Sequence, residues 1–381
     1  MNIKNVGVND HQIDLFEGQY FVPNGMRYNS YILFDEKIVL FDTVDKHFTN
    51  EWMDNIEKEL NGKKPDYIVV HHMEPDHSGS LFEFLKKYPS TKIIASKKAF
   101  EMMVNFSEKE FNNEKVVVDD TSIINVGKNN LSFVSAPLVH WPEVIMTYVD
   151  NEKALFTADA FGKFGATDIN EDWLDEARRY YFGIVGKYGP QVNSLLTKII
   201  NKNLEINTIY SLHGPILDSN ISYYLDLYKK WAGYEAEDEG VLVTYCSIYG
   251  NTKNAIDYLE HKLREKNINC EVVDISRCDI TKALALAFKY KRIVLASVTY
   301  NMDVFPFMKE FINHLTERNY QNRKIGLIEN GSWALNANNT IKKMLSNSKN
   351  LEFCQNEVHI KSAFKENNKV EIDNLVAELI K

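Results

Sequence analysis

Residues 67–80 read Tyr67-Ile-Val-Val-His-His-Met-Glu-Pro-Asp-His-Ser-Gly-Ser80. The first four residues are apolar and predict a short buried strand. Imidazoles and carboxylates fill the positions directly after it, and Ser80 and Glu83 have the spacing of a capping box at a helix start. Buried polar groups need partners, so such a cluster at the end of a strand points to a bound cation.

The bulk composition is that of an ordinary globular protein. The chain has 381 residues, enough for two or three domains, with 44% hydrophobic and 25% charged residues. No apolar run approaches the roughly 18–20 residues that span a bilayer. The start of the chain, Met1-Asn-Ile-Lys-Asn5, lacks the apolar segment of a signal peptide, so we expect a cytoplasmic protein.

The cysteines limit the kinds of metal site. The chain has four, Cys246, Cys270, Cys278 and Cys354, and no pair has CxxC spacing. We therefore expect no disulfide scaffold, zinc ribbon or appended rubredoxin-type module. Any metal held by the first 245 residues must use nitrogen and oxygen ligands.

Charge is divided unevenly along the chain. Residues 1–239 carry 24 Lys and Arg against 37 Asp and Glu, a net charge of −13. Residues 240–381 carry 20 against 16, a net charge of +4. No basic stripe of the kind that binds nucleic acid is evident.

The pattern predicts an α/β protein of two domains. Two hairpins, with turns at 35–37 and 150–153, are each followed by helices, which indicates an αββα sandwich over residues 1–238. An acidic stretch at 234–240 marks the boundary. Residues 239–381 then alternate five strands with helices, which is typical of a doubly wound parallel sheet. Helices are expected over 50–60, 81–87, 97–105, 172–185, 191–201, 221–231, 252–265, 308–316, 334–345 and 372–380.

Seven candidate metal ligands share one context, the end of a strand. They are His72, Glu74, Asp76, His77, His140, Asp159 and His213. In an extended segment, side chains at i and i+2 face the same way, so one metal can bind both His72 and Glu74. The turn at Pro75 can aim the next two at a second metal. His71 should face the opposite way, into the core.

Each of these residues alone is more often a cap or a satisfied hydrogen-bonding group than a ligand. The set is what favours a dinuclear metal site at one end of the sandwich. Four imidazoles and three carboxylates, without sulfur, suit non-haem iron better than zinc.

The second half opens with a phosphate-binding pattern. A buried strand runs into Ser247-Ile-Tyr-Gly-Asn-Thr252 and then into a helix, where backbone N–H groups and the helix dipole favour a phosphate. The stretch is not a Walker A sequence, and no GxGxxG is present, so a built-in NAD(P) site is not expected.

Two later loops leave strands at the same edge of the parallel sheet, where doubly wound folds bind ligands. The cofactor-binding residues predicted from the three loops are Ser247, Ile248, Tyr249, Gly250, Asn251, Thr252, Thr299, Tyr300, Asn301, Met302, Asn330, Gly331, Ser332 and Trp333. Tyr300 or Trp333 would cover a face of a flavin ring.

These motifs together resemble the flavodiiron proteins, within the metallo-β-lactamase superfamily. The resemblance covers essentially the whole chain; Glu74 stands where the superfamily usually has histidine, and Tyr249 where flavodoxins usually have threonine. It implies that His72, Glu74 and His140 bind one iron, that Asp76, His77 and His213 bind the other, and that Asp159 bridges them. It implies FMN in a flavodoxin-like second domain, and the minimal two-domain class.

The resemblance also implies an activity and partners. The expected activity is reduction of O2 to water, of NO to N2O, or both, protecting an anaerobe or microaerophile. Electrons would come through FMN from a donor such as a rubredoxin. A head-to-tail homodimer would bring the FMN of one subunit to the di-iron site of the other.

Other readings stay open at this point. A di-zinc hydrolase with a tethered flavodoxin domain would need zinc and hydrolytic turnover. A flavin electron carrier with a purely structural metal centre would consume neither gas. Trp141 is a candidate wall of the site and Tyr20 a candidate proton donor. We also hypothesise that the basic excess of the second domain steers an acidic donor to the FMN edge.

Overall fold

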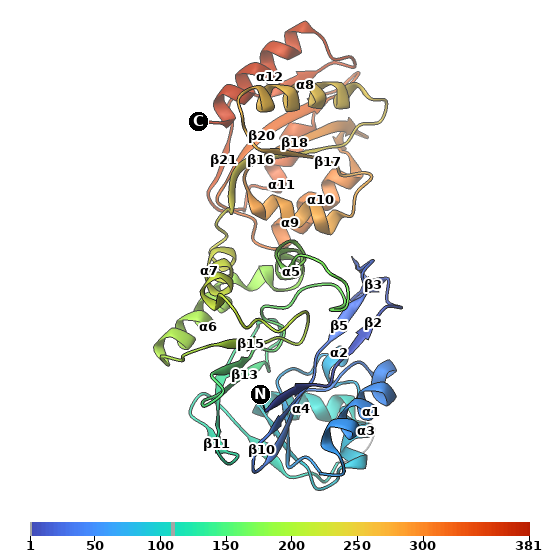
Figure 1. Ribbon diagram of the computed structural model, residues 1–381. Helices are drawn as coiled ribbons and strands as arrows, with labels where there is room; N and C mark the ends of the chain where they lie inside the picture. The colour runs from blue at the N-terminus through green and yellow to red at the C-terminus, as the bar shows by residue number, and fades with distance from the viewer. Residues whose placement is uncertain (1, 108–110) are drawn as a thin grey trace. The chain divides into compact units, whose positions relative to one another are not determined.

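The computed structural model describes residues 2–107 and 111–381, and the chain divides into two compact units, Met1–Lys229 and Lys230–Lys381 (Figure 1). This division falls inside helix α7 (Ile221–Ala232), slightly before the predicted boundary at 238/239. The first strand of the second unit, β16, begins at Asp238, next to that predicted boundary. The assignment of 1–238 and 239–381 as functional domains stays a prediction.

The first unit contains two facing sheets. One has the order β1 (Ile3–Asn5), β6 (Tyr31–Phe34), β7 (Ile38–Phe41), β8 (Tyr67–Val70), β9 (Lys92–Ala95) and β10 (Lys115–Val117). The other has the order β11 (Ile123–Asn125), β12 (Asn130–Ser135), β13 (Ile145–Val149), β14 (Ala154–Phe156) and β15 (Thr208–Tyr210). Both expected hairpins, β6–β7 and β13–β14, are antiparallel pairs in the expected places.

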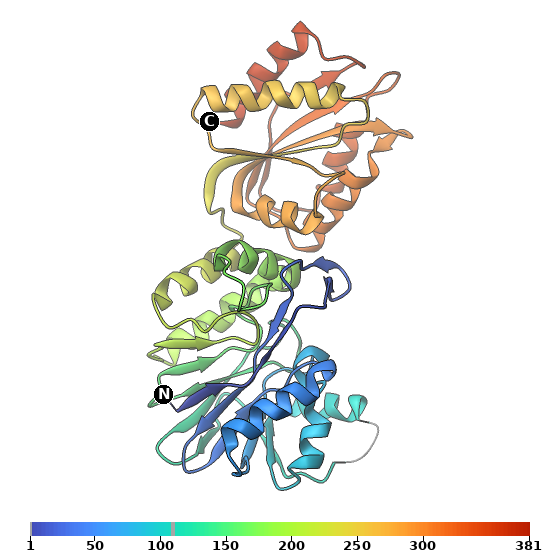
Figure 2. The same ribbon diagram turned by 45° about the vertical axis from the view of Figure 1, so that its right-hand side comes forward.

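Helices cover the outer faces of both sheets (Figure 2). Helices α1 (Thr49–Leu60), α3 (Leu81–Lys87) and α4 (Lys97–Phe106), coloured blue to cyan, pack on the first sheet through a buried apolar cluster. Helices α5 (Trp173–Tyr180), α6 (Gly189–Asn201) and α7, coloured green to yellow, lie outside the second. The αββα sandwich predicted from the sequence is therefore confirmed.

Aromatic rings fill the space between the two sheets. Phe41 of β7 and Phe156 of β14 stack with ring centroids 3.9 Å apart, and Tyr210 of β15 stacks on Phe156 at 4.8 Å. All three side chains are buried. This contact joins β14 and β15, whose ends carry Asp159 and His213, to β7, the neighbour of β8.

Several local expectations were wrong. Ser80 precedes α3, but its hydroxyl contacts Thr49 and the carbonyl of Asp45 instead of capping the helix, so the capping box is absent. The helix expected over 172–185 is α5 followed by a π-helix, η2 (Tyr181–Val185).

Short elements were missed altogether. The single turn α2 (Pro75–Ser78), the 3-10 helices η1 (Lys46–Phe48) and η3 (Gly186–Tyr188), and the small sheets β2 (Val8–Asp10)–β5 (Met26–Tyr28) and β3 (Leu15–Phe16)–β4 (Tyr20–Phe21) were not anticipated. They are too short to show a hydrophobic period.

The second unit is the predicted doubly wound sheet. Its strand order is β17 (Cys270–Asp274), β16 (Asp238–Tyr245), β18 (Tyr290–Tyr300), β20 (Arg323–Asn330) and β21 (Leu351–Phe353), all parallel. Helices α8 (Asn251–Glu265) and α12 (Glu366–Leu379) lie on one face, and α9 (Ile280–Lys289), α10 (Pro306–Glu317) and α11 (Ala337–Met344) on the other.

Two details of this unit differ from expectation. Helix α9 was missed, and the last strand is broken into β21 and β22 (Val358–Ile360), which both pair with β20. A two-residue strand, β19 (Asp303–Val304), also pairs with β18. Among the helices of the described residues, none is long and apolar enough to cross a lipid bilayer.

The stack between the sheets is testable. We expect Phe156→Ala to lower the free energy of unfolding by about 3–5 kcal/mol, because it leaves a cavity against Phe41 and Tyr210. Chemical denaturation measures the change. The control Ile123→Ala, at a side chain that is 69% exposed, should change stability by no more than about 0.5 kcal/mol. Equal effects would show that the stack is not a main contributor.

Candidate metal centre and flavin cleft

The ends of four strands bring the seven predicted ligands together. His72 and Glu74 follow β8, and α2 presents Asp76 and His77. The remaining three, His140, Asp159 and His213, follow β12, β14 and β15. They form two groups whose ligand atoms lie within 4.8 Å of one another: His72, Glu74, His140 and Asp159 in one, and Asp76, His77 and His213 in the other.

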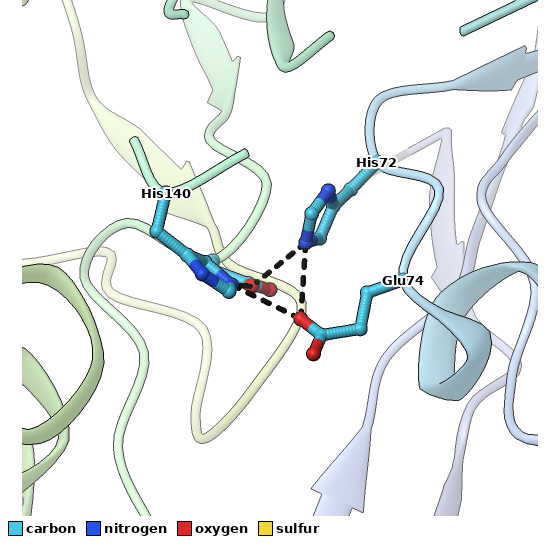
Figure 3. Close-up of side chains that lie close together, drawn as sticks. His72, Glu74 and His140 are labelled. Atoms are coloured by element: carbon cyan, nitrogen blue, oxygen red, sulfur yellow. Dashed lines mark hydrogen bonds and ion pairs between the residues drawn. The ribbon is translucent and has the colours of Figure 1, made fainter. Parts of the chain in front are cut away.

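The first group converges on one point (Figure 3). Oε2 of Glu74 lies 3.2 Å from Nε2 of His72 and 3.0 Å from Nε2 of His140. Both rings and the carboxylate point toward one another in the close-up. Three ligand atoms from two strand ends therefore face a common centre.

The second group has the same form. Nε2 of His77 lies 3.1 Å from Oδ2 of Asp76 and 3.0 Å from Nε2 of His213. Oδ2 of Asp76 is also 3.3 Å from the His213 nitrogen. Two imidazoles and one carboxylate again face one point.

Asp159 lies between the two groups. Its Oδ2 is 3.1 Å from Nε2 of His140, and its Oδ1 is 3.1 Å from Nε2 of His77. The residue is 1% exposed. Because each oxygen faces a different group, this carboxylate has the geometry of a bridge between two metals.

The donor atoms fit two cations. Nδ1 of His72 contacts Glu143 at 2.8 Å, and Nδ1 of His213 contacts the carbonyl of Arg27 at 2.7 Å. These acceptors place the ring proton on Nδ1, so each Nε2 is free to bind metal. Ligand atoms on adjacent corners of an octahedron with bonds of about 2.1 Å lie about 3 Å apart, as they do here.

Unpartnered acceptors support the same fit. Within the described residues, neither carboxylate oxygen of Asp76 nor Oδ1 of Asp159 accepts a hydrogen bond from outside the ligand set, and their near neighbours are the imidazoles of the site, although both residues are buried. Buried carboxylate oxygens without donors are costly unless a cation satisfies them. Iron fits this set, because three of the seven ligands are carboxylates and none is a thiolate.

Without a cation, the carboxylates would hold protons on the imidazoles. Burial alone lowers the pKa of His140, but hydrogen bonds to Asp159 and Glu74 raise it to about 10. Burial also opposes the charged form of His72, while Asp159 and Glu143 raise its pKa to about 9. Burial raises the pKa of Asp159, but the nearby imidazoles hold it well below its usual value.

His71 lies outside both groups, as the alternation of the strand predicts. Its Nδ1 contacts Asp42 at 2.5 Å and its Nε2 contacts the hydroxyl of Thr147 at 2.7 Å. Its ring stacks on Phe41, with centroids 5.8 Å apart. It therefore anchors the end of β8 in the space between the sheets.

Trp141, the candidate wall of the site, and Tyr20, the candidate proton donor, differ in where the structure places them. The Trp141 ring lies 5.2 Å from the ring of His72 and 6.2 Å from that of His140, so it stands beside the first group. The Tyr20 hydroxyl instead donates to the carbonyl of Gly183 at 2.7 Å, in the π-helix. The hypothesis that Tyr20 donates a proton to the site is therefore not supported.

Two residues near the site were missed from the sequence. Tyr180 is buried, its ring lies 5.3 Å from that of His213, and its hydroxyl has no hydrogen-bond partner among the described residues. Burial and the carboxylates of Asp159 and Asp76 hold its pKa well above the usual value. Glu143 is buried against His72. In the sequence, only its position three residues after the candidate ligand His140 indicated that Glu143 could lie near the site.

The loops of the second unit form a cavity of about 180 Å³ at the carboxyl ends of β16, β18 and β20. It is lined by Ser247, Ile248, Tyr249, Asn251, Thr252, Val298, Thr299, Asn330, Gly331, Ser332, Trp333 and Ser362. All three predicted loops therefore contribute. Val298 and Ser362 were not predicted. Ser362 follows β22, the second part of the divided last strand, and the sequence pattern did not show a ligand-binding loop there.

Four predicted cofactor residues do not line this cavity. Gly250 lies in the first loop as the residue before α8, with φ +88°. Tyr300 and Asn301 line a neighbouring cavity, and Met302 is half exposed. The chain reverses at Asn301 and Met302, and β19 then pairs with the end of β18, with Tyr300 opposite Asp303. Trp333 lines the cavity at 79% exposure and Tyr300 lines the neighbouring one, so covering of a flavin ring by either residue stays a prediction.

The cavity fits a phosphate-bearing ligand such as FMN. Among the described residues, the backbone N–H groups of 247–250 have no acceptor, and the N-terminus of α8 lies in the same loop. A Cβ at Gly331 would lie 1.8 Å from the carbonyl of Ala334, so only glycine allows this tight turn. The Asn330 amide donates to Thr252 at 3.3 Å and to the Ser362 carbonyl at 3.1 Å, which ties three loops together.

Comparison with known proteins identifies the family. Residues 26–220 match the model of the ODP family beta lactamase, and residues 242–358 match a flavodoxin domain. The anaerobic nitric oxide reductase flavorubredoxin of Vibrio vulnificus is 30% identical over 343 residues, covering 87% of this chain and 69% of that protein. This chain belongs to the flavodiiron protein family.

Solved structures show the same flavodiiron fold. The flavodiiron protein from Giardia intestinalis is 24% identical with a TM-score of 0.92, covering 100% of this chain and 94% of that one. The rubredoxin oxygen:oxidoreductase from Desulfovibrio gigas is 22% identical with a TM-score of 0.91, covering 100% and 96%. At these identities the likeness establishes the fold, and metal binding by the seven residues stays a prediction.

The raised histidine pKa values predict a pH dependence for protein stripped of metal by a chelator. A histidine whose folded pKa is raised stabilises the fold below its unfolded pKa of about 6.5, and this contribution is lost as pH rises through the folded value. For His72 and His140 the loss should occur toward about pH 9 and 10.

The melting temperature of the stripped protein should therefore fall as the pH rises from about 6.5 to 10. Metal-loaded protein, in which these imidazoles are neutral ligands, is the control and should show a smaller fall. A stripped protein whose melting temperature is flat across this range would contradict the proton network described above.

Proposed function

We propose that this flavodiiron protein reduces O2 to water, NO to N2O, or both, at a di-iron centre that receives electrons through FMN. The observation that carries the proposal is the position of Asp159, whose two oxygens face two matched sets of imidazoles and carboxylate. The cavity at the carboxyl ends of β16, β18 and β20 supports the flavin part. The names of the relatives, nitric oxide reductase and oxygen oxidoreductase, support the substrates.

The seven candidate ligands would bind two irons. His72, Glu74 and His140 would hold one iron, Asp76, His77 and His213 the other, and Asp159 both. Bound iron would supply one-electron chemistry and open positions for a diatomic gas. Around His213, the rings of Phe16, Tyr28 and Tyr180 pack with centroid distances of 5.3–6.0 Å and restrict access of water.

Protons must reach the site from the protein or from solvent. The hydroxyl of Tyr180 keeps its proton because its pKa is raised, and that hydroxyl has no other hydrogen-bond partner in the described residues. We propose it as a hydrogen-bond donor beside His213, because its ring packs against that imidazole and its hydroxyl still has a proton to donate. Tyr20 is a poorer candidate, because its hydroxyl donates to the carbonyl of Gly183.

The proposal includes a donor, an assembly and a location. A rubredoxin-like protein would reduce the flavin, and a head-to-tail homodimer would bring the flavin of one subunit to the irons of another. The opposite charges of the two halves, −13 for residues 1–239 and +4 for 240–381, support such a pairing. A cytoplasmic location is part of the proposal, and the four free thiols fit a reducing compartment.

The central experiment is an electrode assay of O2 and NO consumption with a reduced rubredoxin, after iron and FMN have been quantified. Asp159→Asn should lower turnover by at least ~10–100-fold, because even outer contacts of metal ligands have effects of that size. Asp168→Asn, at an exposed ion pair with His11, is the matched control and should retain activity. Zinc with hydrolytic turnover, or iron without gas consumption, would refute the proposal.

The dependence on salt tests the steering of the donor. Lys253 and Lys309, beside the two cavities of the flavin edge, each pair with an aspartate at 2.7 Å, so attraction must come from the basic excess of the whole unit. Electron transfer from an acidic donor should slow several-fold as the Debye length falls from roughly 30 to 8 Å. A neutral small-molecule reductant is the control. Rates indifferent to salt would count against steering.

A further inference from the structure

Glu143 is a buried carboxylate that touches the metal centre without belonging to it. It is 1% exposed, and its Oε1 accepts hydrogen bonds from Nδ1 of His72 and from the backbone N–H of Met73, both at 2.8 Å. Its Oε2 has no donor, and no lysine or arginine pairs with it among the described residues. Its negative charge therefore acts on the His72 ring with little compensation.

The direct ligands of the two groups are balanced. Each group has two imidazoles and one carboxylate of its own, and each faces one oxygen of Asp159. Formal ligand charge is thus equal on the two sides. Formal ligand charge therefore gives no difference between the two metals, whereas the contacts of the ligands themselves give one.

Those outer contacts are unequal. In the first group, His72 donates from Nδ1 to the Glu143 carboxylate. In the second group, His213 donates from Nδ1 to the neutral carbonyl of Arg27, and Nδ1 of His77 is buried without a partner in the described part of the chain. A carboxylate acceptor gives the imidazole anionic character and makes it a stronger donor to metal, which a carbonyl does much less.

We propose that Glu143 is a positioning residue that orients His72 and makes the metal of the His72–Glu74–His140 group the harder of the two to reduce. The inference rests on the proposed di-iron function. When one electron from the flavin or an external reductant enters the fully ferric centre, one Fe(III) becomes Fe(II) and no bond is broken. The structure assigns that electron to the metal of the Asp76–His77–His213 group.

The test substitutes Glu143→Gln, which keeps the shape and an acceptor oxygen for His72 but removes the charge. Potentiometric titration of the iron-loaded protein, followed by EPR and Mössbauer spectroscopy, resolves the two one-electron steps. We expect the lower midpoint potential to rise, so that the gap between the two steps narrows. Binding of the first group's metal, measured with Co²⁺ in the stripped protein, should weaken by about 10–100-fold.

Asp42→Asn is the matched control. It alters a buried carboxylate–imidazole pair of the same kind, between Asp42 and His71, that touches no ligand side chain. This variant should leave the difference between the two midpoint potentials and the affinity for Co²⁺ unchanged, even if the fold is less stable. Glu143→Asp keeps the charge and should stay nearer to the wild type than Glu143→Gln.

The outcomes separate this inference from the proposed function. The role of Glu143 is overturned if the difference between the two midpoint potentials is unchanged in iron-loaded Glu143→Gln. It is also overturned if Asp42→Asn changes that difference equally. Either result is compatible with a wild type that consumes O2 or NO. A wild type that holds iron and FMN but consumes neither gas overturns the proposed function. The Co²⁺ measurement tests the contact between Glu143 and His72 in either case.

Discussion

The carboxylate of Asp159 is the contact on which the rest of the centre depends. Each of its oxygens must face a different pair of imidazoles, so the ends of β8, β12, β14 and β15 have to meet around it. The loop after β14 is shaped for this. Ala158 has φ +50°, and a Cβ at Gly162 would lie 2.9 Å from the carbonyl of Asp159 and 3.2 Å from Cβ of His213. Only glycine lets the two ligand loops approach so closely.

Such a cluster does not stabilise a fold by itself. Glu74 and Asp159 are negative groups with ligand atoms within 4.8 Å of one another, Asp76 lies in the adjoining group, and all three are mostly out of contact with water. Like charges at this spacing repel unless protons or cations lie between them. The stacked rings of Phe41, Phe156 and Tyr210, just behind the strand ends, supply the apolar contact that keeps the sheets together. Binding is thus built on a separately stabilised scaffold.

The same principle builds the flavin cleft in the second unit. Parallel strands β16, β18 and β20 end at one edge, and their loops carry small and hydroxyl-bearing residues instead of metal ligands. The Asn330 side chain joins these loops through hydrogen bonds to Thr252 and Ser362. It has the same linking position in this unit that Asp159 has between the two ligand groups of the first unit. One chain therefore places two chemically different sites at strand ends, where backbone and side-chain groups are free of the sheet.

The sequence alone determined both folds, the seven-residue set and the three flavin loops, because strand ends, hairpin turns and ligand types are local patterns. It also separated His71 from His72, since strand alternation is local. Only the tertiary structure decided what the ligands touch. The contact of Glu143 with His72, the position of Tyr180 beside His213 and the hydrogen bond from Tyr20 to Gly183 all join segments that are distant in sequence. Such contacts produce no periodic pattern in the sequence, because they form between segments that come together only when the sheets pack.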